Sequence, residues 1–275
     1  MSEPAWHRPR TIAEALALRS ELGEDALVIA GGTYIGVLLS AGLIAAPAAF
    51  ISLRGVEELH GLACDRDGLR LGSLVTHRRV ECEASVRAGG YAALADTFAA
   101  VANVRIRALA TVGGVLADAD YASDPPAMLC ALGARVVLAS ARGERRLSVE
   151  ELILGYYETA IEPDELLVRV ELSPPVPAIY LKFRSRSSED RPCVGVAVAR
   201  GSRLRVVVGA VADRPQILPE VCALADGREL SAELRDEIAA RYGEGIEALG
   251  DLRGSAHYRR RVTRVLVRRA LEVVA

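Results

Sequence analysis

The feature that most constrains this chain is an uncharged stretch from Ala26 to Leu53 that is long enough to cross a bilayer. A membrane helix needs about 20 consecutive apolar residues. Here glycines and Pro47 interrupt the run, and Leu27–Ala30 and Phe50–Leu53 are typical of strands on either side of a Gly31–Thr33 turn and a short helix. Because buried parallel strands also give continuous apolar runs, we predict a buried β–loop–α–β unit rather than a membrane span.

The composition is that of a folded protein without a strong overall charge. Of 275 residues, 51% are hydrophobic and 25% are charged, which excludes a disordered chain. The 34 basic residues are balanced by 36 acidic ones, so no positive field would attract nucleic acid or acidic membranes. We therefore expect no nucleic-acid partner. All basic residues except Lys182 are arginine.

The cysteines and histidines give no sign of a metal site. No two cysteines form CxxC, and the histidines lack HxxxH or HExxH spacing, so we expect no metal in this chain. Scattered, odd-numbered cysteines favour a reducing compartment. Charged residues occupy the N-terminal segment where a secretory signal needs an apolar core, so we expect the protein to be cytoplasmic.

Helix and strand signals alternate irregularly along the chain, which predicts an α+β fold. A capping box at Thr11–Glu14 begins an amphipathic helix that ends at Gly23. Ser173–Pro177 is too rich in proline for a helix or a central strand, so we place a domain boundary there. The expected domains are 1–173, with subdomains of about 1–55 and 56–173, and 178–275.

The C-terminal part is expected to contain three strands followed by helices at 232–242 and 257–274. The last helix is rich in arginine, which could indicate binding to nucleic acid or a membrane surface. Packing or a subunit contact is the stronger interpretation, because arginines near a helix C-terminus complement its dipole. The apolar residues expected to form a buried stripe are Val262, Val265, Leu266, Ala270 and Leu271.

Two glycine-pair loops, each expected at a strand end, are the candidate binding elements: Ala30–Tyr34 (AGGTY) and Ala110–Gly114 (ATVGG). Adjacent glycines let successive backbone N–H groups point into one anion-binding concavity. Two such loops could clamp one pyrophosphate, although each could also be a simple tight turn. The acidic stretch Asp118–Asp124 could accept hydrogen bonds from sugar hydroxyls.

Five motifs in order make the resemblance to a known family specific. They are AGGTYIG (30–36), IRALATVGGVLADADYASD (106–124), GYYETAIEPDELL (155–167), YLKFRSRSSED (180–190) and GSAHYRRRVTRVLVRRAL (254–271). Together they resemble the FAD-binding medium subunit of molybdenum hydroxylases, the xanthine dehydrogenase and carbon monoxide dehydrogenase family. The resemblance runs from the first predicted helix to the last.

This resemblance implies a vanillyl-alcohol-oxidase-type FAD-binding domain of two subdomains, followed by a smaller C-terminal α+β domain. It also implies that the two loops hold FAD, that a Ser-Asp pair binds near its sugar, that a leucine contacts the flavin and that a lysine lies near it. No catalytic acid or base is implied. The corresponding residues are Ala30, Gly31, Gly32, Thr33, Tyr34, Ile35, Thr111, Gly113, Gly114, Val115, Ser123, Asp124, Leu167 and Lys182.

The family also implies partner subunits. A large subunit would hold the molybdenum cofactor, and a small subunit would pass electrons through two [2Fe-2S] clusters to FAD and on to an acceptor, as a dimer of heterotrimers. Lys182 would favour the reduced, anionic flavin by Coulomb attraction. Val115, Ala108 and Tyr121 depart from the family's usual Asn or Asp, Asn and Pro, so an FAD-free scaffold subunit remains the alternative. The substrate and the acceptor are not identified by the sequence.

Overall fold

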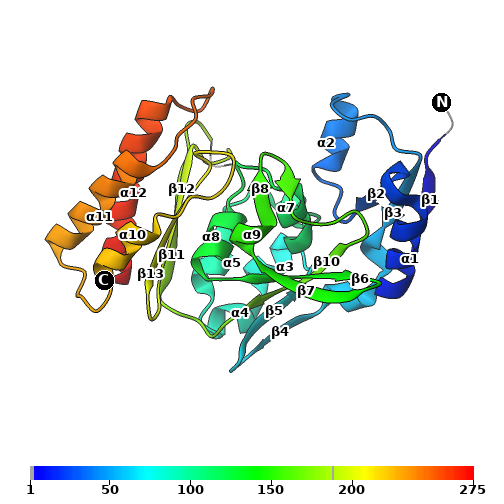
Figure 1. Cartoon of the computed structure of the whole chain (residues 1–275), viewed down its shortest axis with the longest axis horizontal. Helices are drawn as coiled ribbons and strands as arrows, with labels where there is room; N and C mark the ends of the chain where they lie inside the picture. Colours follow the sequence, from blue (N-terminus) through cyan, green and yellow to red (C-terminus); the bar gives the residue numbers. More distant parts are fainter. Residues whose placement is uncertain (1–2, 188) are drawn as a thin grey trace.

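The computed structural model describes residues 3–187 and 189–275. Figure 1 shows the N-terminal sheet at one end of the long axis, a central sheet, and a C-terminal sheet that is covered by helices at the other end. Helices and mostly antiparallel strands are mixed without regular alternation, which confirms the α+β prediction.

The N-terminal sheet is parallel, with the strand order β1-β3-β2. The Thr11 hydroxyl oxygen caps the first helix by accepting from the Glu14 N–H at 3.1 Å. The Glu14 carboxylate accepts from the Arg10 N–H instead of that of Thr11, so the capping box is only half formed. Strand β1 was not predicted. The elements are β1 (Ala5–His7), α1 (Ile12–Leu22), β2 (Ala26–Ile29), α2 (Ile35–Ser40) and β3 (Ala49–Ser52).

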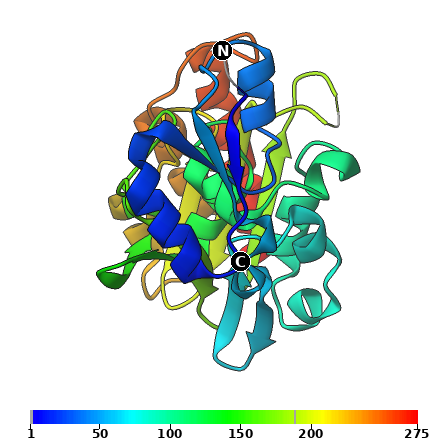
Figure 2. The same cartoon turned by 90° about the vertical axis from the view of Figure 1, so that its right-hand side faces the viewer.

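The uncharged stretch forms the predicted strand–helix–strand order, but α2 is not buried. Figure 2 shows α2 standing above the parallel sheet. No residue from 27 to 48 is fully buried, and Val37 and Leu43 are 56% and 70% exposed. The prediction of a buried unit is therefore right for β3 and wrong for α2, a six-residue helix with no layer over it. Within the described residues, no helix is long and apolar enough to cross a membrane.

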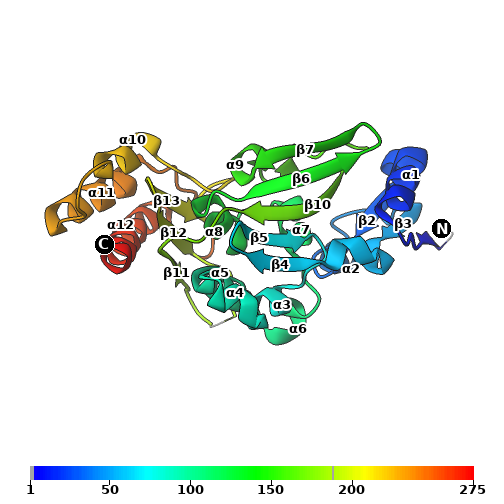
Figure 3. The same ribbon diagram turned by 90° about the horizontal axis from the view of Figure 1, so that it is seen from below.

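The central sheet is antiparallel, with the strand order β4-β5-β10-β6-β7, and Figure 3 shows these strands beside a group of short helices. Side chains alternate across it with period two. Val136 and Leu138 of β6 face one core, whereas Val137 and Ala139 face a second core shared with the parallel sheet. The strands are β4 (Leu62–Asp65), β5 (Gly68–Gly72), β6 (Arg135–Ser140), β7 (Gly143–Ser148) and β10 (Leu166–Leu172).

Short helices and one hairpin surround this sheet, and α7 carries the second glycine loop of the predicted site. The hairpin is formed by β8 and β9. These elements are α3 (His77–Cys82), α4 (Ala84–Ala88), α5 (Ala92–Ala99), α6 (Val104–Arg107), α7 (Val112–Asp118), α8 (Pro125–Ala131), α9 (Val149–Leu152), β8 (Ile153–Gly155) and β9 (Glu158–Thr159). Single turns of 3-10 helix lie at Gly23–Asp25, Leu53–Gly55, Glu57–His60 and Ala223–Ala225.

The C-terminal sheet packs on both faces, because β12 alternates large and small side chains. Its valines face the C-terminal helices, whereas Ala197 and Ala199 face the central core. The sheet therefore joins the two parts of the chain. The elements are β11 (Ala178–Phe183), β12 (Val194–Arg200), β13 (Leu204–Gly209), α10 (Pro219–Cys222), α11 (Ala232–Gly245) and α12 (Ala256–Val274).

Helix α12 corrects two details of the prediction. Val265 is 47% exposed and lies outside the buried stripe. Arg259 is fully buried and lies in the first turn, so the dipole at the helix C-terminus cannot explain it. Its guanidinium instead donates to the carbonyl oxygen of Cys193 and pairs with the carboxylate of Asp251.

Candidate FAD site at the two glycine loops

The structure brings the two glycine loops into contact. A Cβ at Gly31 would lie 1.9 Å from the carbonyl oxygen of Leu109, directly before the second loop. Only glycine allows this approach. The first loop connects β2 to α2 as predicted. The second loop was expected at a strand end, but it follows α6 and begins α7.

The first loop presents unpaired backbone donors. Within residues 3–187 and 189–275, the structure records no protein acceptor for the backbone N–H groups from Gly31 to Ile35. Hydrogen bonding resumes with Gly36, whose N–H donates to the Gly32 carbonyl at 3.0 Å. Gly32 has φ +70°, a conformation that suits glycine. Consecutive free N–H groups at the start of a helix form an anion-binding site.

The second loop uses its backbone donors internally. The N–H groups of residues 112–115 donate to the carbonyl oxygens of Val75, Ser73 and Thr111 and to the Thr111 hydroxyl, at 2.8–3.1 Å. These bonds cap α7 and fix it to the segment after β5. Of the two interpretations left open for the second loop, the tight turn therefore fits better, because its N–H groups at 112–115 already have protein acceptors. This loop instead gives a rigid, close-packed surface, because a Cβ at Gly113 would lie 2.5 Å from that of Ser73.

The buried His77 holds the second loop in place through hydrogen bonds to its carbonyl groups. Its side chain is 1% exposed, and its Nε2 lies 3.2 Å from the carbonyl oxygen of Thr111. Burial lowers the pKa of His77 to about 4, so the neutral imidazole donates this hydrogen bond. The His77 backbone N–H also donates to the Ala110 carbonyl at 2.9 Å. His77 therefore fixes the first two residues of the second loop, Ala110 with its backbone and Thr111 with its side chain.

The structure pairs two predicted cofactor residues with each other. Lys182 Nζ lies 2.8 Å from Asp124 Oδ2, and both side chains are 4% exposed. Tyr180 donates from its hydroxyl to Asp124 Oδ1 at 2.7 Å, and Lys182 also donates to the Ala100 carbonyl at 2.8 Å. Burial raises the pKa of Asp124, and the Lys182 ammonium opposes that rise. Lys182 is thus already paired with a carboxylate, and its attraction for the reduced flavin stays a prediction.

The remaining predicted residues divide between the core and the site surface. Leu167 is 6% exposed in the central core, and Val115 packs partly buried against the same core. Ala30 packs against the second core. Thr33 and Ser123 are half-buried. Contacts of these residues with FAD remain predictions.

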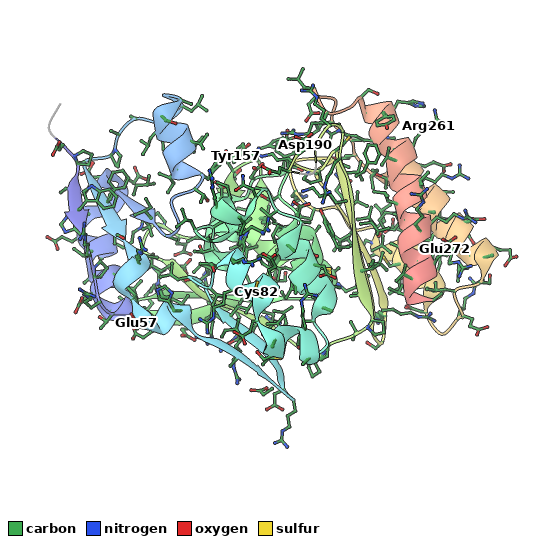
Figure 4. All side chains as sticks on the ribbon, turned by 180° about the vertical axis from the view of Figure 1, so that it is seen from behind. Glu57, Cys82, Tyr157, Asp190, Arg261 and Glu272 are labelled. Atoms are coloured by element: carbon green, nitrogen blue, oxygen red, sulfur yellow. The ribbon has the colours of Figure 1, made fainter. Side chains whose placement is uncertain are left out.

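Aromatic side chains connect the first loop to the β8–β9 hairpin. Tyr34 stacks on Tyr157 with ring centroids 5.9 Å apart, and burial raises the pKa of Tyr34. Asp118 at the end of α7 lies close enough to add to this rise, and burial together with Asp120 raises its own pKa to about 7. Figure 4 places Tyr157 and Asp190 on the same side of the molecule, near the middle of its long axis. The sequence motifs do not reveal this stack.

The residues present fit FAD. The free N–H groups of the first loop match a pyrophosphate, and the glycines at 31 and 113 bring the two loops within contact distance. Among the described residues, no three His, Cys, Asp or Glu side chains gather as metal ligands. The free backbone N–H groups of the first loop are the donors that suit an anion.

Comparison with known proteins places the chain in one family over its length. The model for the FAD binding domain in molybdopterin dehydrogenase matches residues 2–175. The model for the CO dehydrogenase flavoprotein C-terminal domain matches residues 179–274.

Individual proteins of the same family are similar to this chain over nearly its whole length. The carbon monoxide dehydrogenase medium chain of Afipia carboxidovorans is 30% identical, with 97% of this chain and 95% of the relative covered. The nicotine 6-hydroxylase medium subunit of Paenarthrobacter nicotinovorans is 32% identical, with 96% and 94% covered. Among solved structures, quinoline 2-oxidoreductase from Pseudomonas putida 86 is 28% identical with a TM-score of 0.91, covering 99% of this chain and 97% of that one.

These matches confirm FAD as the cofactor of this chain and an oxidoreductase subunit as its class. The molybdenum and iron–sulfur centres of such enzymes belong to partner subunits. The chain belongs to the FAD-binding medium subunits of the molybdenum hydroxylases, the family that includes carbon monoxide dehydrogenase and xanthine dehydrogenase.

Proposed function

We propose that this chain is the electron-transfer subunit of a molybdenum hydroxylase. It receives electrons from the iron–sulfur clusters of a small partner subunit and passes them through FAD to an external acceptor. When bound, FAD supplies the redox chemistry, and the protein supplies binding, orientation and electrostatics. The observation that carries this proposal is the row of free backbone N–H groups from Gly31 to Ile35 against the rigid second loop.

The residues of the site would divide the work of holding the cofactor. The N–H groups of the first loop bind the pyrophosphate, because they are the donors that the protein leaves free. The second loop, held by His77, lets the cofactor approach the backbone closely. Asp124 offers its remaining lone pairs to sugar hydroxyls, since a carboxylate accepts about four hydrogen bonds and the protein supplies two.

Val115 favours a second candidate, an FAD-free scaffold subunit. A valine there gives no polar side-chain contact to a cofactor. However, Val115 packs against the central core, and its backbone N–H donates to Thr111 as the cap of α7 requires. The substitution thus leaves the loop intact, which supports the FAD-carrying subunit.

The visible spectrum of the purified full chain separates these two candidates. The FAD-carrying subunit is expected to be yellow, with one FAD per chain released on denaturation. A Gly31→Ala variant is the control, because its Cβ separates the two loops and should leave the protein colourless. A folded, colourless wild-type protein in the presence of added FAD would instead establish the scaffold.

The same proposal includes a large molybdenum subunit and a small iron–sulfur subunit, assembled as a dimer of heterotrimers in the cytoplasm. The relatives are medium chains of multi-subunit enzymes. The uncharged exposed surface at Val37 and Leu43 is of the kind that partner proteins cover. Co-purification with an iron–sulfur and a molybdenum subunit from the native source tests the assembly, and a chain that elutes alone at the monomer mass contradicts it.

A further inference from the structure

The acidic segment Asp118–Asp124 makes several polar contacts between the first domain and the C-terminal domain, beside those of Arg205 with Cys130 and Glu150. Beyond the bonds of Asp124 to Tyr180 and Lys182, Arg191 Nη2 lies 2.7 Å from Asp120 Oδ2. The Asp120 side chain is 4% exposed. A segment predicted to bind the sugar of FAD therefore also receives side chains from the other domain.

A third contact comes from Tyr121 in the middle of the segment. Its hydroxyl donates to Asp251 Oδ2 at 3.2 Å and accepts from Arg253 Nη1 at 3.1 Å. The Asp251 carboxylate in turn pairs with the buried guanidinium of Arg259. The segment is thus held at 120, 121 and 124, each time by a residue beyond the Ser173–Pro177 linker.

Strand β11 carries two of these side chains, Tyr180 and Lys182, on the face that contacts Asp124. Tyr180 and Lys182 are two residues apart, so they lie on the same face of the strand. Their partners on β12 are Ala197 and Gly195. A Cβ at Gly195 would lie 2.3 Å from the Tyr180 hydroxyl, so the glycine provides the space in which this hydroxyl reaches Asp124.

We propose that Tyr180 is a positioning residue for FAD and that the segment 118–124 is the joint through which the C-terminal domain acts on the cofactor site. The Tyr180 hydroxyl donates to one oxygen of Asp124 and the Lys182 ammonium donates to the other, and these two bonds fix the plane of the carboxylate. This leaves about one lone pair on each oxygen, in a fixed orientation. This inference rests on the proposed function, because it assigns the fixed carboxylate to a sugar hydroxyl of FAD.

A purely structural role for Tyr180 is the competing explanation, and Tyr242 provides the matched control. Tyr242 is fully buried in α11, and its hydroxyl donates to the Val206 carbonyl at 2.7 Å and accepts from the Leu218 N–H at 3.0 Å. Tyr242→Phe removes a buried hydroxyl from the same domain without touching the segment 118–124. Tyr180→Phe removes one that contacts Asp124.

The test is titration of the full-length chain with FAD, followed by flavin fluorescence, together with thermal unfolding of each variant. We expect Tyr180→Phe to weaken FAD binding about tenfold, as the loss of one hydrogen bond to a charged group would. Tyr242→Phe should lower the unfolding temperature at least as much but leave FAD affinity at the wild-type value. In an Asp124→Asn background, Tyr180→Phe should weaken binding much less than in the wild type.

Three results would overturn the inference. Wild-type affinity in Tyr180→Phe excludes a positioning role, and equal losses of affinity in Tyr180→Phe and Tyr242→Phe reduce the effect to stability. Full additivity with Asp124→Asn shows that Tyr180 does not act through this carboxylate. A wild-type chain that binds no FAD instead overturns the proposed function itself, so the two failures are distinguishable.

Discussion

The two glycine loops are alike in sequence and opposite in the use of their backbone. The first loop is half-buried, and its N–H groups from Gly31 to Ile35 have no acceptor in the part of the chain that the structure describes. The second loop donates all four N–H groups of 112–115 within the protein and is mostly buried. A glycine pair therefore does not by itself make an anion site. A loop can bind an anion only if its backbone N–H groups do not already donate to acceptors within the protein.

This difference predicts that substitutions in the two glycine loops have different consequences. The second loop is fixed by hydrogen bonds to Ser73 and Val75 and continues into α7, so changes in this loop should mainly reduce the stability of the folded chain. The first loop contributes no fully buried side chain to the core and presents free N–H groups, so changes there should mainly reduce FAD binding. Each substitution below is measured for both quantities.

The largest loss of stability is expected for Lys182→Met, on the side of the second loop. It leaves the Asp124 carboxylate buried without its ammonium partner, a change that costs about 3–5 kcal/mol. Urea unfolding of the chain without FAD measures the loss. The double variant with Asp124→Asn is the control and should recover much of it. A loss below about 1 kcal/mol would show that the pair is solvated.

A pair of glycine substitutions gives the sharpest contrast between the loops. In Gly113→Ala the Cβ meets the Cβ of Ser73 at 2.5 Å and its carbonyl oxygen at 2.9 Å, and overpacking of this kind costs up to about 3 kcal/mol. In Gly31→Ala the half-exposed loop can shift away from Leu109, so we expect a smaller loss of stability but no FAD binding. Unfolding and FAD titration of both variants check this. A Gly31→Ala chain that binds FAD normally would contradict the assignment.

A smaller and pH-dependent effect is expected at His77, which supports only the second loop. Its pKa is lowered to about 4 in the folded chain, so between about pH 6.5 and 4 the unfolded chain binds more protons. The contribution of His77 is therefore complete above pH 6.5 and is lost as the pH falls, by about 2 kcal/mol at pH 5. Unfolding at pH 7 and pH 5 should show a smaller difference in His77→Gln than in the wild type. An equal difference would mean that His77 is not the titrating group.

The sequence predicts local features of this site well and distant contacts poorly. The turn at Gly31–Thr33 and strand β3 follow from local patterns, and the structure places both as expected. Two acceptors for the second loop, the carbonyl groups of Ser73 and Val75, could not be predicted, because these residues lie far away in sequence. The exposure of α2 was missed because a run without charge indicates burial only where another layer covers it.

Tyr180 could have been found from the sequence and was not. It lies two residues before Lys182 on a predicted strand, so both side chains share a face. The contact between Arg191 and Asp120 has no such signal, because it depends on how a loop crosses between domains. Charged residues in the motif were read as cofactor contacts, whereas the structure also uses them to connect the two domains.

Amide hydrogen exchange of the full chain, with and without FAD, tests the central claim most directly. Without FAD, the N–H groups of residues 31–35 should exchange fast and those of 112–115 slowly, because only the latter are hydrogen-bonded. Saturating FAD should protect residues 31–35 strongly and change 112–115 little. The account is contradicted if residues 31–35 stay unprotected in the presence of FAD, or if the new protection appears at 112–115 instead.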